Sequence, residues 1–238
     1  MPKAWTSSLD EAAKKHLSRG IARLGFSISD QQFALFVTYL QELKRWNRRA
    51  NLVGFRTDEA LVRHGLLESL SLLTAFRFRP DIRLIDIGSG AGLPGIPLKI
   101  AAPELTVTLV EASRKKASFL KQAVRLLRLP GIRVLHTRAE LLSTDPLHRE
   151  AYDLVTARAV ARLPAVVTLC TPFLKPGGHL LLPVGPQWPR EAETLRRPDL
   201  RIEGAVPTSG DRHLLIVAKV ATVSRETPVP VSQPECFT

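Results

Sequence analysis

Cysteine and long apolar runs are scarce in this chain of 238 residues. Its two cysteines, Cys170 and Cys236, lie in an apolar stretch and in a polar tail, which excludes a disulfide framework. No C-x-x-C pair is present, so no metal site is predicted. No apolar run approaches the roughly 20 residues that cross a bilayer, and the polar first residues do not resemble a secretory signal. We therefore expect a protein of a reducing compartment, the cytoplasm by default, with no membrane partner.

Acidic residues are too few to balance the basic ones. The chain has 34 Lys and Arg against 22 Asp and Glu, a formal charge of +12. Such a surplus suits a polyanionic partner, because each phosphate contact releases counterions and the charge steers encounter. A basic surface that serves only solubility is the alternative. The length and a hydrophobic content of 45% allow one large domain, or one domain with an appendage.

Glycine is concentrated at every second position after a short apolar run that ends in Asp86, at Gly88, Gly90 and Gly92. Glycine alternation lets the backbone turn sharply beside a ligand. At the carboxyl end of a buried strand, such a turn is where open α/β sheets bind nucleotide-like cofactors. Leu93 stands where the third glycine of a dinucleotide fingerprint belongs. The pattern therefore favours a nucleoside without a pyrophosphate, a tight turn without a ligand being the alternative.

A second acid ends the next predicted strand. Glu111 follows a run rich in β-branched residues and lies about twenty residues beyond the glycines, the spacing at which an acid meets a ribose diol. Residues 112–116 open a helix, and anions also favour a helix N-terminus. The spacing favours the ribose role over that of a helix-start acid.

The chain divides into three parts. Residues 1–80 show no convincing strand, and apolar residues at three- and four-residue steps predict one helix from about Ile28 to Leu43, capped by Ser29 or Asp30, and another over 57–76. We interpret this part as a helical cap that packs on the sheet. Residues 221–238 contain three prolines and predict an extended or disordered tail.

Between these parts, residues 81–220 alternate strand and helix. This alternation predicts an α/β domain with a mostly parallel sheet, helices on both faces and an antiparallel pair at one edge. Residues 176–178 are expected to form a turn before the fifth strand. The expected strands are 83–87, 106–111, 133–137, 152–156, 179–184, 200–207 and 213–220, and the helices between them include 92–101, 113–127 and 163–173.

Taken together, several segments form a more specific set. They are the glycine turn 86–95, 111–116, Arg138-Ala139-Glu140, 157–161, 45–47, 51–53, 63–64, 68–70 and 174–178. The set resembles the bacterial RsmG (GidB) family, which uses S-adenosylmethionine to methylate N7 of a guanine in small-subunit ribosomal RNA. The resemblance extends over roughly residues 30 to 220. It implies a Rossmann-like class I methyltransferase with a seven-stranded sheet, S-adenosylmethionine as cofactor, and 16S ribosomal RNA or the small ribosomal subunit as partner. No obligate protein partner is indicated.

The resemblance also implies roles for single residues. It assigns catalysis to Arg158, Asn51 and His64. Glu140 could instead be a first-turn helix acid, Arg158 a structural ion pair, and His64 an ordinary helix histidine. The residues expected to bind the cofactor are Asp86, Gly88, Gly90, Leu93, Glu111, Ala112, Ser113, Ala139, Glu140 and Arg158.

The chemistry of guanine N7 asks little of the protein. Its in-plane lone pair is unprotonated at neutral pH, so attack on a sulfonium methyl needs no general base and catalysis rests on alignment. Neither an Asn-Pro-Pro-Tyr segment nor a Pro-Cys nucleophile is present, which disfavours amino and cytosine-C5 methylation. A small-molecule methyltransferase and a non-catalytic ribosome-binding protein remain as alternatives.

Basic residues of the cap are candidates for an RNA surface, with a solvated helix face as the alternative. They are Arg45, Arg48, Arg49, Arg56 and Arg63, with Trp46 interleaved for stacking. The chain departs from the family in two places. A lysine expected after the fifth strand is missing before Gly185, where Arg190 could compensate, and the tail is not basic.

Overall fold

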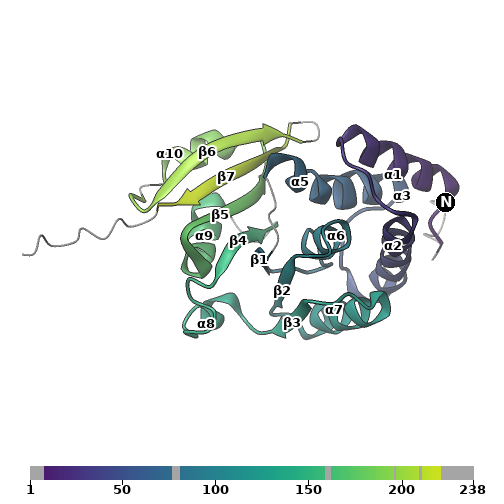
Figure 1. The fold of residues 1–238 in the computed structure, drawn as a ribbon, viewed down its shortest axis with the longest axis horizontal. Helices are drawn as coiled ribbons and strands as arrows, with labels where there is room; N and C mark the ends of the chain where they lie inside the picture. The colour runs from purple at the N-terminus through teal and green to yellow at the C-terminus, as the bar shows by residue number, and fades with distance from the viewer. Residues whose placement is uncertain (1–7, 77–80, 159–161, 196, 209–210, 221–238) are drawn as a thin grey trace, which may run out of the picture.

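The structure, a computed structural model, describes residues 8–76, 81–158, 162–195, 197–208 and 211–220. A seven-stranded sheet runs through the middle of these residues in the order β3-β2-β1-β4-β5-β7-β6 (Figure 1). Its strands are β1 (Arg83–Ile87), β2 (Thr106–Glu111), β3 (Ile132–His136), β4 (Tyr152–Ala157), β5 (Leu174–Val184), β6 (Leu200–Pro207) and β7 (His213–Lys219).

Strand order places a switch point next to the glycine turn. Strands β1 to β5 are parallel, and β7 runs antiparallel to both β5 and β6. β1 pairs with β2 on one side and with β4 on the other. The chain therefore continues from β1 through β2 to β3 at one edge of the sheet, and it then crosses to β4 on the opposite side of β1. Ligands of open α/β sheets bind at this point, outside the carboxyl ends of the strands. The predicted fold class, with its antiparallel edge pair, is confirmed.

Helices cover both faces of the sheet (Figure 1). Alternate residues of β1 point to opposite faces, as a strand requires: Leu84 joins one hydrophobic core, and Ile85 joins the other. The first core lies under α2 (Asp30–Ala50), α6 (Gly95–Ala101) and α7 (Arg114–Leu127), and the second under α8 (Ala139–Leu142), α9 (Leu163–Cys170) and α10 (Trp188–Glu193).

The N-terminal helices have no core of their own. Leu17, Phe36 and Leu66 belong to the same buried cluster as Leu84 of β1, so burial against the sheet stabilises them. Ser29, one of the two candidates predicted to cap α2, forms a capping box with Gln32. The remaining elements here are α1 (Glu11–Arg23), α3 (Asp58–Ala60), the π-helix η1 (Leu61–Leu67), α4 (Glu68–Leu70) and α5 (Leu72–Ala75).

Two of these elements differ from the expectation. The single helix expected over 57–76 is divided by η1, and π-helical turns are frequent at functional sites. No helix was predicted at α1, although its buried Ala13, Leu17 and Ile21 recur at every fourth residue, the spacing of one helix face. The polar character of the rest of this segment concealed that face.

Other boundaries also moved. The turn expected at 176–178 lies inside β5, where Tyr152 pairs with Leu174 but Leu154 pairs with His179. The turn residues are therefore accommodated as an irregularity of a longer strand. The helix expected over 163–173 ends at Cys170 and continues as a short 3₁₀ turn, Thr171–Phe173, because a proline follows Thr171 and cannot extend an α-helix. The predicted tail, with Cys236, lies outside the described residues.

No helix in the described ranges is both long and apolar enough to span a bilayer.

Candidate functional site

A cavity of about 520 Å³ opens at the carboxyl ends of β1, β2, β3 and β4, within the size range of small-molecule sites. The turn after each strand contributes to its wall, and a loop of the cap, Leu52 to Phe55, closes the other side. The lining residues are Leu52, Val53, Gly54, Phe55, Ile87, Gly88, Ser89, Gly90, Ala91, Leu93, Val110, Glu111, Ala112, Lys116, Thr137, Arg138, Ala139, Glu140, Arg158 and Leu169.

The glycine turn needs its glycines for two different reasons. Gly90 has a φ of 53°, a left-handed conformation that brings its N–H toward Glu111. At Gly92, with φ 84°, an added Cβ would lie 2.5 Å from the Ile96 side chain. The hydroxyl of Tyr39 on α2 donates a hydrogen bond to the Ala91 carbonyl at 2.7 Å. The cap therefore holds the turn from outside the sheet.

Glu111 joins two segments of the cavity wall. Its Oε2 accepts a hydrogen bond from the Gly90 N–H at 2.8 Å and its Oε1 accepts one from the Ser113 N–H at 2.7 Å. The side chain is buried, and each carboxylate oxygen has a second lone pair. Ser113 is the N-cap of α7, so both predicted situations of Glu111 occur together: it faces the cavity, and it also binds a helix start.

Asp86 lies beneath the turn and is not among the cavity-lining residues. Its Oδ2 accepts a hydrogen bond from the Gly95 N–H at 3.2 Å, and its Oδ1 has no partner in the described part of the chain. Complete burial raises the pKa of Asp86 to about 7, against the lowering effect of the Gly95 and Ser89 hydrogen bonds. An added Cβ at Gly95 would overlap Leu109, so glycine is required for this close packing.

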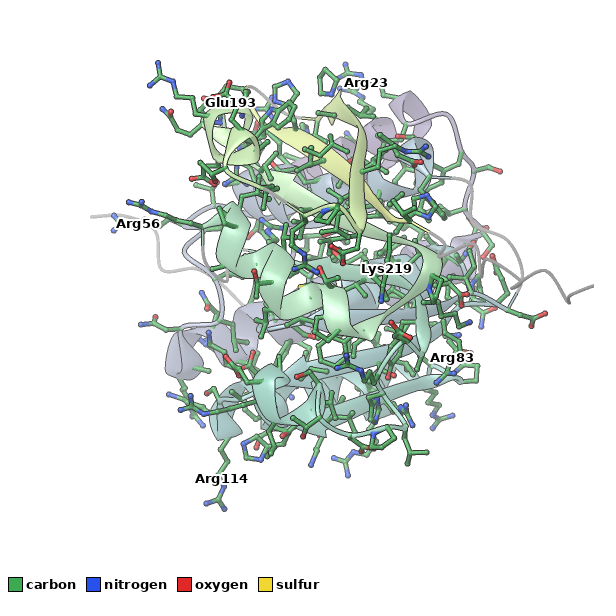
Figure 2. The ribbon with its side chains drawn as sticks, turned by 90° about the vertical axis from the view of Figure 1, so that its left-hand side faces the viewer. Arg23, Arg56, Arg83, Arg114, Glu193 and Lys219 are labelled. Carbon is green, nitrogen blue, oxygen red and sulfur yellow. The ribbon has the colours of Figure 1, made fainter. Side chains whose placement is uncertain are left out.

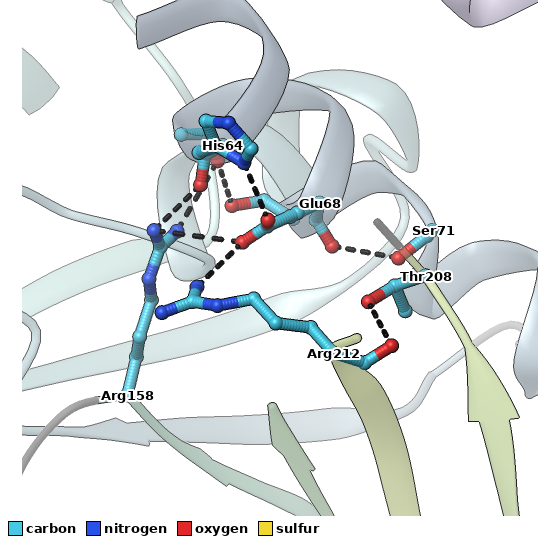
Figure 3. Close-up of polar contacts among 8 residues, drawn as sticks. His64, Glu68, Ser71, Arg158, Thr208 and Arg212 are labelled. Carbon is cyan, nitrogen blue, oxygen red and sulfur yellow. Dashed lines mark hydrogen bonds and ion pairs between the residues drawn. The ribbon is translucent and has the colours of Figure 1, made fainter. Parts of the chain in front are cut away.

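Arg158 lies at the rim, between the cavity and the cap. Its Nη2 donates to the His64 carbonyl at 2.5 Å and its Nη1 to the Gly65 carbonyl at 3.4 Å (Figure 3). The guanidinium is 6.0 Å from the centroid of the Phe55 ring, a distance typical of cation–π contacts. Burial lowers the pKa of Arg158, and the Glu68 carboxylate opposes that shift. The arginine thus connects the end of β4 to η1.

Glu68 is the centre of this connection, although no role was predicted for it. Its buried carboxylate accepts from His64 Nδ1 at 2.9 Å and from Arg212 Nη1 at 3.0 Å, with Arg158 Nη2 at 3.8 Å (Figure 3). Arg212 comes from the β6–β7 turn, 144 residues away in sequence. The only signal in the sequence was an acid four residues after a histidine in a helix.

Besides Asp86, three further expected site residues do not line the cavity. His64 directs its ring to Glu68 and stacks on Phe55 at 6.4 Å. Asn51 is an exposed left-handed C-cap of α2, and Ser113 contacts Glu111 only through its backbone. Their roles in binding or catalysis stay predictions.

Asn47 shapes the loop that follows α2. Its Oδ1 accepts from the N–H groups of Leu52 and Val53, at 2.6 and 2.9 Å, and its Nδ2 donates to the Val53 carbonyl at 3.0 Å. The side chain of Asn47 therefore fixes the cap side of the cavity.

The far end of the cavity contains Ala139 and Glu140, as expected. Glu140 is exposed in the first turn of α8. It therefore lies beside the cavity and also at a helix start, the two positions predicted for it. Lys116 and Arg138 line the same end; both stood in the quoted motifs without an assigned role. Within the described residues, no cluster of three or more His, Cys, Asp or Glu side chains is arranged to hold a metal ion.

The basic residues of the cap are exposed, whereas Trp46, expected as a stacking residue, is partly buried. The Trp46 ring packs edge-on against Phe119 at 5.8 Å, and its N–H donates to Glu42 at 2.8 Å. Packing against α7 decided its position. The exposed arginines are Arg45, Arg48, Arg49, Arg56 and Arg63.

A parallel sheet with this strand order and a cavity at its switch point defines a Rossmann-like methyltransferase fold. A structure of an S-adenosylmethionine-dependent methyltransferase from Aquifex aeolicus matches 75% of this chain and 98% of that one, with a TM-score of 0.56 and 13% identity. At such low identity the match concerns the fold alone.

Sequence comparison identifies the family. Residues 32–209 match the model of the GidB family, described as rRNA small subunit methyltransferase G. Ribosomal RNA small subunit methyltransferase G of Chloroflexus aggregans is 42% identical, covering 88% of this chain and 91% of that protein. The protein of the same name from Roseiflexus sp. strain RS-1 is 40% identical, covering 88% and 93%.

The chain belongs to the rRNA small subunit methyltransferase G family, and it is a ribosomal RNA methyltransferase. Its cofactor is S-adenosylmethionine, the methyl donor of this family. The family resemblance and the cofactor predicted from the motifs are confirmed.

Proposed function

We propose that this enzyme methylates N7 of a guanine in 16S ribosomal RNA, within the small subunit or its RNA. The cofactor occupies the cavity at the ends of β1 to β4, and the target base enters beside Arg158. The observation that carries the proposal is the position of Glu111 and Arg158, which line one cavity from different strand ends. The substrate makes the cytoplasm the place of action. We also propose that residues 1–80 act as a cap on a catalytic domain of residues 81–220.

The wall of the cavity fits S-adenosylmethionine. Glu111 is buried and binds two backbone N–H groups, so its carboxylate is held in position before a ligand arrives. The remaining lone pairs accept hydrogen bonds from both ribose hydroxyls. Gly88, Gly90 and Leu93 would hold the ribose and methionine part of the cofactor, and Ala112, Ala139 and Glu140 would hold its adenine. When bound, the cofactor supplies an electrophilic methyl group on a sulfonium.

Catalysis by this chain rests on positioning. Guanine N7 attacks through a lone pair that carries no proton, so no side chain has to remove one. In agreement, no histidine, cysteine or tyrosine is found among the described residues that line the cavity. Arg158 uses two donors on the carbonyls of η1, and a guanidinium has five N–H groups. The remaining donors orient the guanine O6 or a neighbouring phosphate. Asn51 and His64 remain the proposed catalytic residues of the cap, although neither lines the cavity.

The charge distribution favours RNA over a small-molecule substrate. Arg56 and Arg114 extend away from the body of the protein (Figure 2), and Lys116 and Arg138 line the cavity itself. A polyanion that passes over this entrance contacts several cations at once. A small methyl acceptor makes no use of them.

The test is methyl transfer from labelled S-adenosylmethionine into purified small ribosomal subunits and into their protein-free 16S RNA, followed by mapping of the modified base. We expect one guanine to carry the label at N7, in a reaction that weakens as salt concentration rises. Label at an exocyclic amine or on another base would overturn the N7 assignment. A salt-insensitive reaction with small acceptors, and none with RNA, would overturn the substrate class.

A further inference from the structure

A second cavity, of about 620 Å³, lies on the other side of Glu68 from the cofactor site. We name it the α1–η1 groove, since α1 forms one wall and η1 the other, with Thr208 at one end. Three exposed arginines, Arg19, Arg23 and Arg63, line it. Its remaining lining residues are His16, Gly20, Leu24, His64, Leu67, Glu68 and Ser71.

The groove has a surplus of positive charge that the protein does not neutralise. In the described ranges, the side chains of Arg19, Arg23 and Arg63 have neither an ion pair nor a hydrogen-bond partner. Glu68 is the single acid of the lining, and it is buried and paired with Arg212. Exposed guanidinium groups gathered around a concave surface suit phosphate oxygens, which accept bidentate hydrogen bonds from arginine.

The wall of the groove is built for a close approach of two helices. Gly20 lies inside α1, where glycine is less favourable than alanine. An added Cβ there would overlap the Leu67 side chain of η1. Glycine thus lets α1 lie directly on η1. Arg19 and Arg23, four residues apart, share one face of α1, and both border the groove.

Side-chain contacts lead from the groove to the cofactor cavity without a gap. His64 and Glu68 line the groove; Phe55 and Arg158 line the cavity. His64 stacks on Phe55, and Arg158 binds the His64 carbonyl. The groove and the cavity are therefore neighbours, connected through His64, Phe55 and Arg158, and a strand whose target base enters beside Arg158 has to extend past these residues to reach the groove.

We propose that the α1–η1 groove binds phosphates of the ribosomal RNA strand next to the target guanine, with Arg19, Arg23 and Arg63 as the phosphate ligands. The proposal rests on the function proposed above. It adds a binding site on α1, a helix that lies before residue 32, where the match to the family model begins.

The test compares R19A/R23A with wild type and with K121A/R125A, which removes two exposed charges from α7 and leaves the groove intact. Methyl transfer from labelled cofactor into small subunits is measured at several salt concentrations. For R19A/R23A we expect the KM for subunits to rise about tenfold, with kcat little changed. The slope of log KM plotted against log salt concentration should fall by about 0.7 for each arginine removed, which is the value for one phosphate contact to a single strand. R63A should add to both effects.

Further measurements separate binding from folding. Calorimetric affinity for S-adenosylmethionine and the thermal unfolding midpoint should match wild type in every variant, because the mutated side chains are exposed. R19K/R23K should keep the wild-type salt dependence, because both charges remain, and its KM should rise less than that of R19A/R23A, although lysine loses the bidentate contacts. If wild type modifies subunits and R19A/R23A shows the wild-type KM and salt dependence, the groove proposal is overturned alone. If wild type transfers no methyl to subunits or their RNA, the proposed function fails first.

Discussion

The two walls of the cofactor cavity are built in different ways. The wall at the strand ends uses backbone groups over short sequence distances: Glu111 binds the N–H groups of Gly90 and Ser113, 21 and 2 residues away. The cap wall is a loop, Leu52 to Phe55, and long-range side-chain contacts attach the cap to the sheet: Arg158 and Arg212 reach η1 and Glu68 across 94 and 144 residues. The first wall is thus specified by local turns, while the second exists only once the chain is folded. Mutations should affect the two walls differently.

The largest effect should come from Asp86 beneath the first wall. Its pKa of about 7 in the folded protein exceeds the unfolded value of about 3.9, so the folded state binds an extra proton between these values. This contribution to stability is fully present below the unfolded pKa and is lost as pH rises through the folded pKa. The loss amounts to about 4 kcal/mol from pH 4 to above pH 7.

We expect Asp86→Asn to remove this pH dependence, since an amide does not ionise and its oxygen still accepts from Gly95. The measurement is the free energy of unfolding in urea at a series of pH values, for D86N and wild type. Asp211→Asn, at an exposed position, serves as the control and should follow wild type. Parallel pH curves for D86N and wild type would contradict the prediction.

Glu111→Gln should weaken cofactor binding about 100-fold, or about 2.7 kcal/mol. The amide nitrogen cannot accept the N–H that one carboxylate oxygen now binds, nor can it accept a ribose hydroxyl. Calorimetric titration with S-adenosylmethionine measures the change. Glu104→Gln removes the same charge at an exposed position before β2, and it should bind like wild type. Equal affinities for the two variants would remove Glu111 from the proposed ribose site.

Glu68→Gln should have the smallest effect, and it should act on the cap wall alone. Loss of the charge weakens the contacts to Arg212 and Arg158, and we expect the free energy of unfolding to fall by about 1.5 kcal/mol. The expected loss of unfolding free energy is smaller than for a fully buried ion pair, because the side chain of Arg212 is 48% exposed. Affinity for S-adenosylmethionine should stay within about twofold, because Glu68 does not line the cavity. Urea unfolding and calorimetry give both quantities.

The comparison for this variant is Glu59→Gln, an exposed acid of α3, which should leave both quantities unchanged. A large loss of cofactor affinity in E68Q would show that the two walls are coupled, contrary to the distinction drawn above.

Sequence patterns predicted the strand-end wall well because its geometry follows from spacing. A glycine pair with an acid after the next strand indicates a nucleoside site wherever the two strands are adjacent and parallel, and β1 and β2 are. The same patterns could not foresee that Asp86 would be sealed beneath the turn. Burial depends on α6 packing over it, which Gly95 permits through its missing side chain.

The cap was harder to predict for a related reason. Periodicity indicated helices, but neither the π-helical segment η1 nor the inward position of Trp46 can be derived from it. Both depend on what the helix packs against: Phe119 for Trp46, and Arg158 for the carbonyls of η1. Asn51 and Asn47 are both polar residues near the same loop, and the sequence does not distinguish their roles. Only the folded loop shows which of the two binds its backbone.

By itself, the sequence determined the succession of strands, the nucleoside-type turn and its acid partner, because these follow from side-chain period and from backbone requirements at fixed spacing. The tertiary structure decided which residues line the cavity, which carboxylate is buried at the centre of the cap contacts, and that α1 and η1 enclose a basic groove. Those features depend on side chains brought together from distant parts of the chain, and their contacts form only when the helices pack on the sheet.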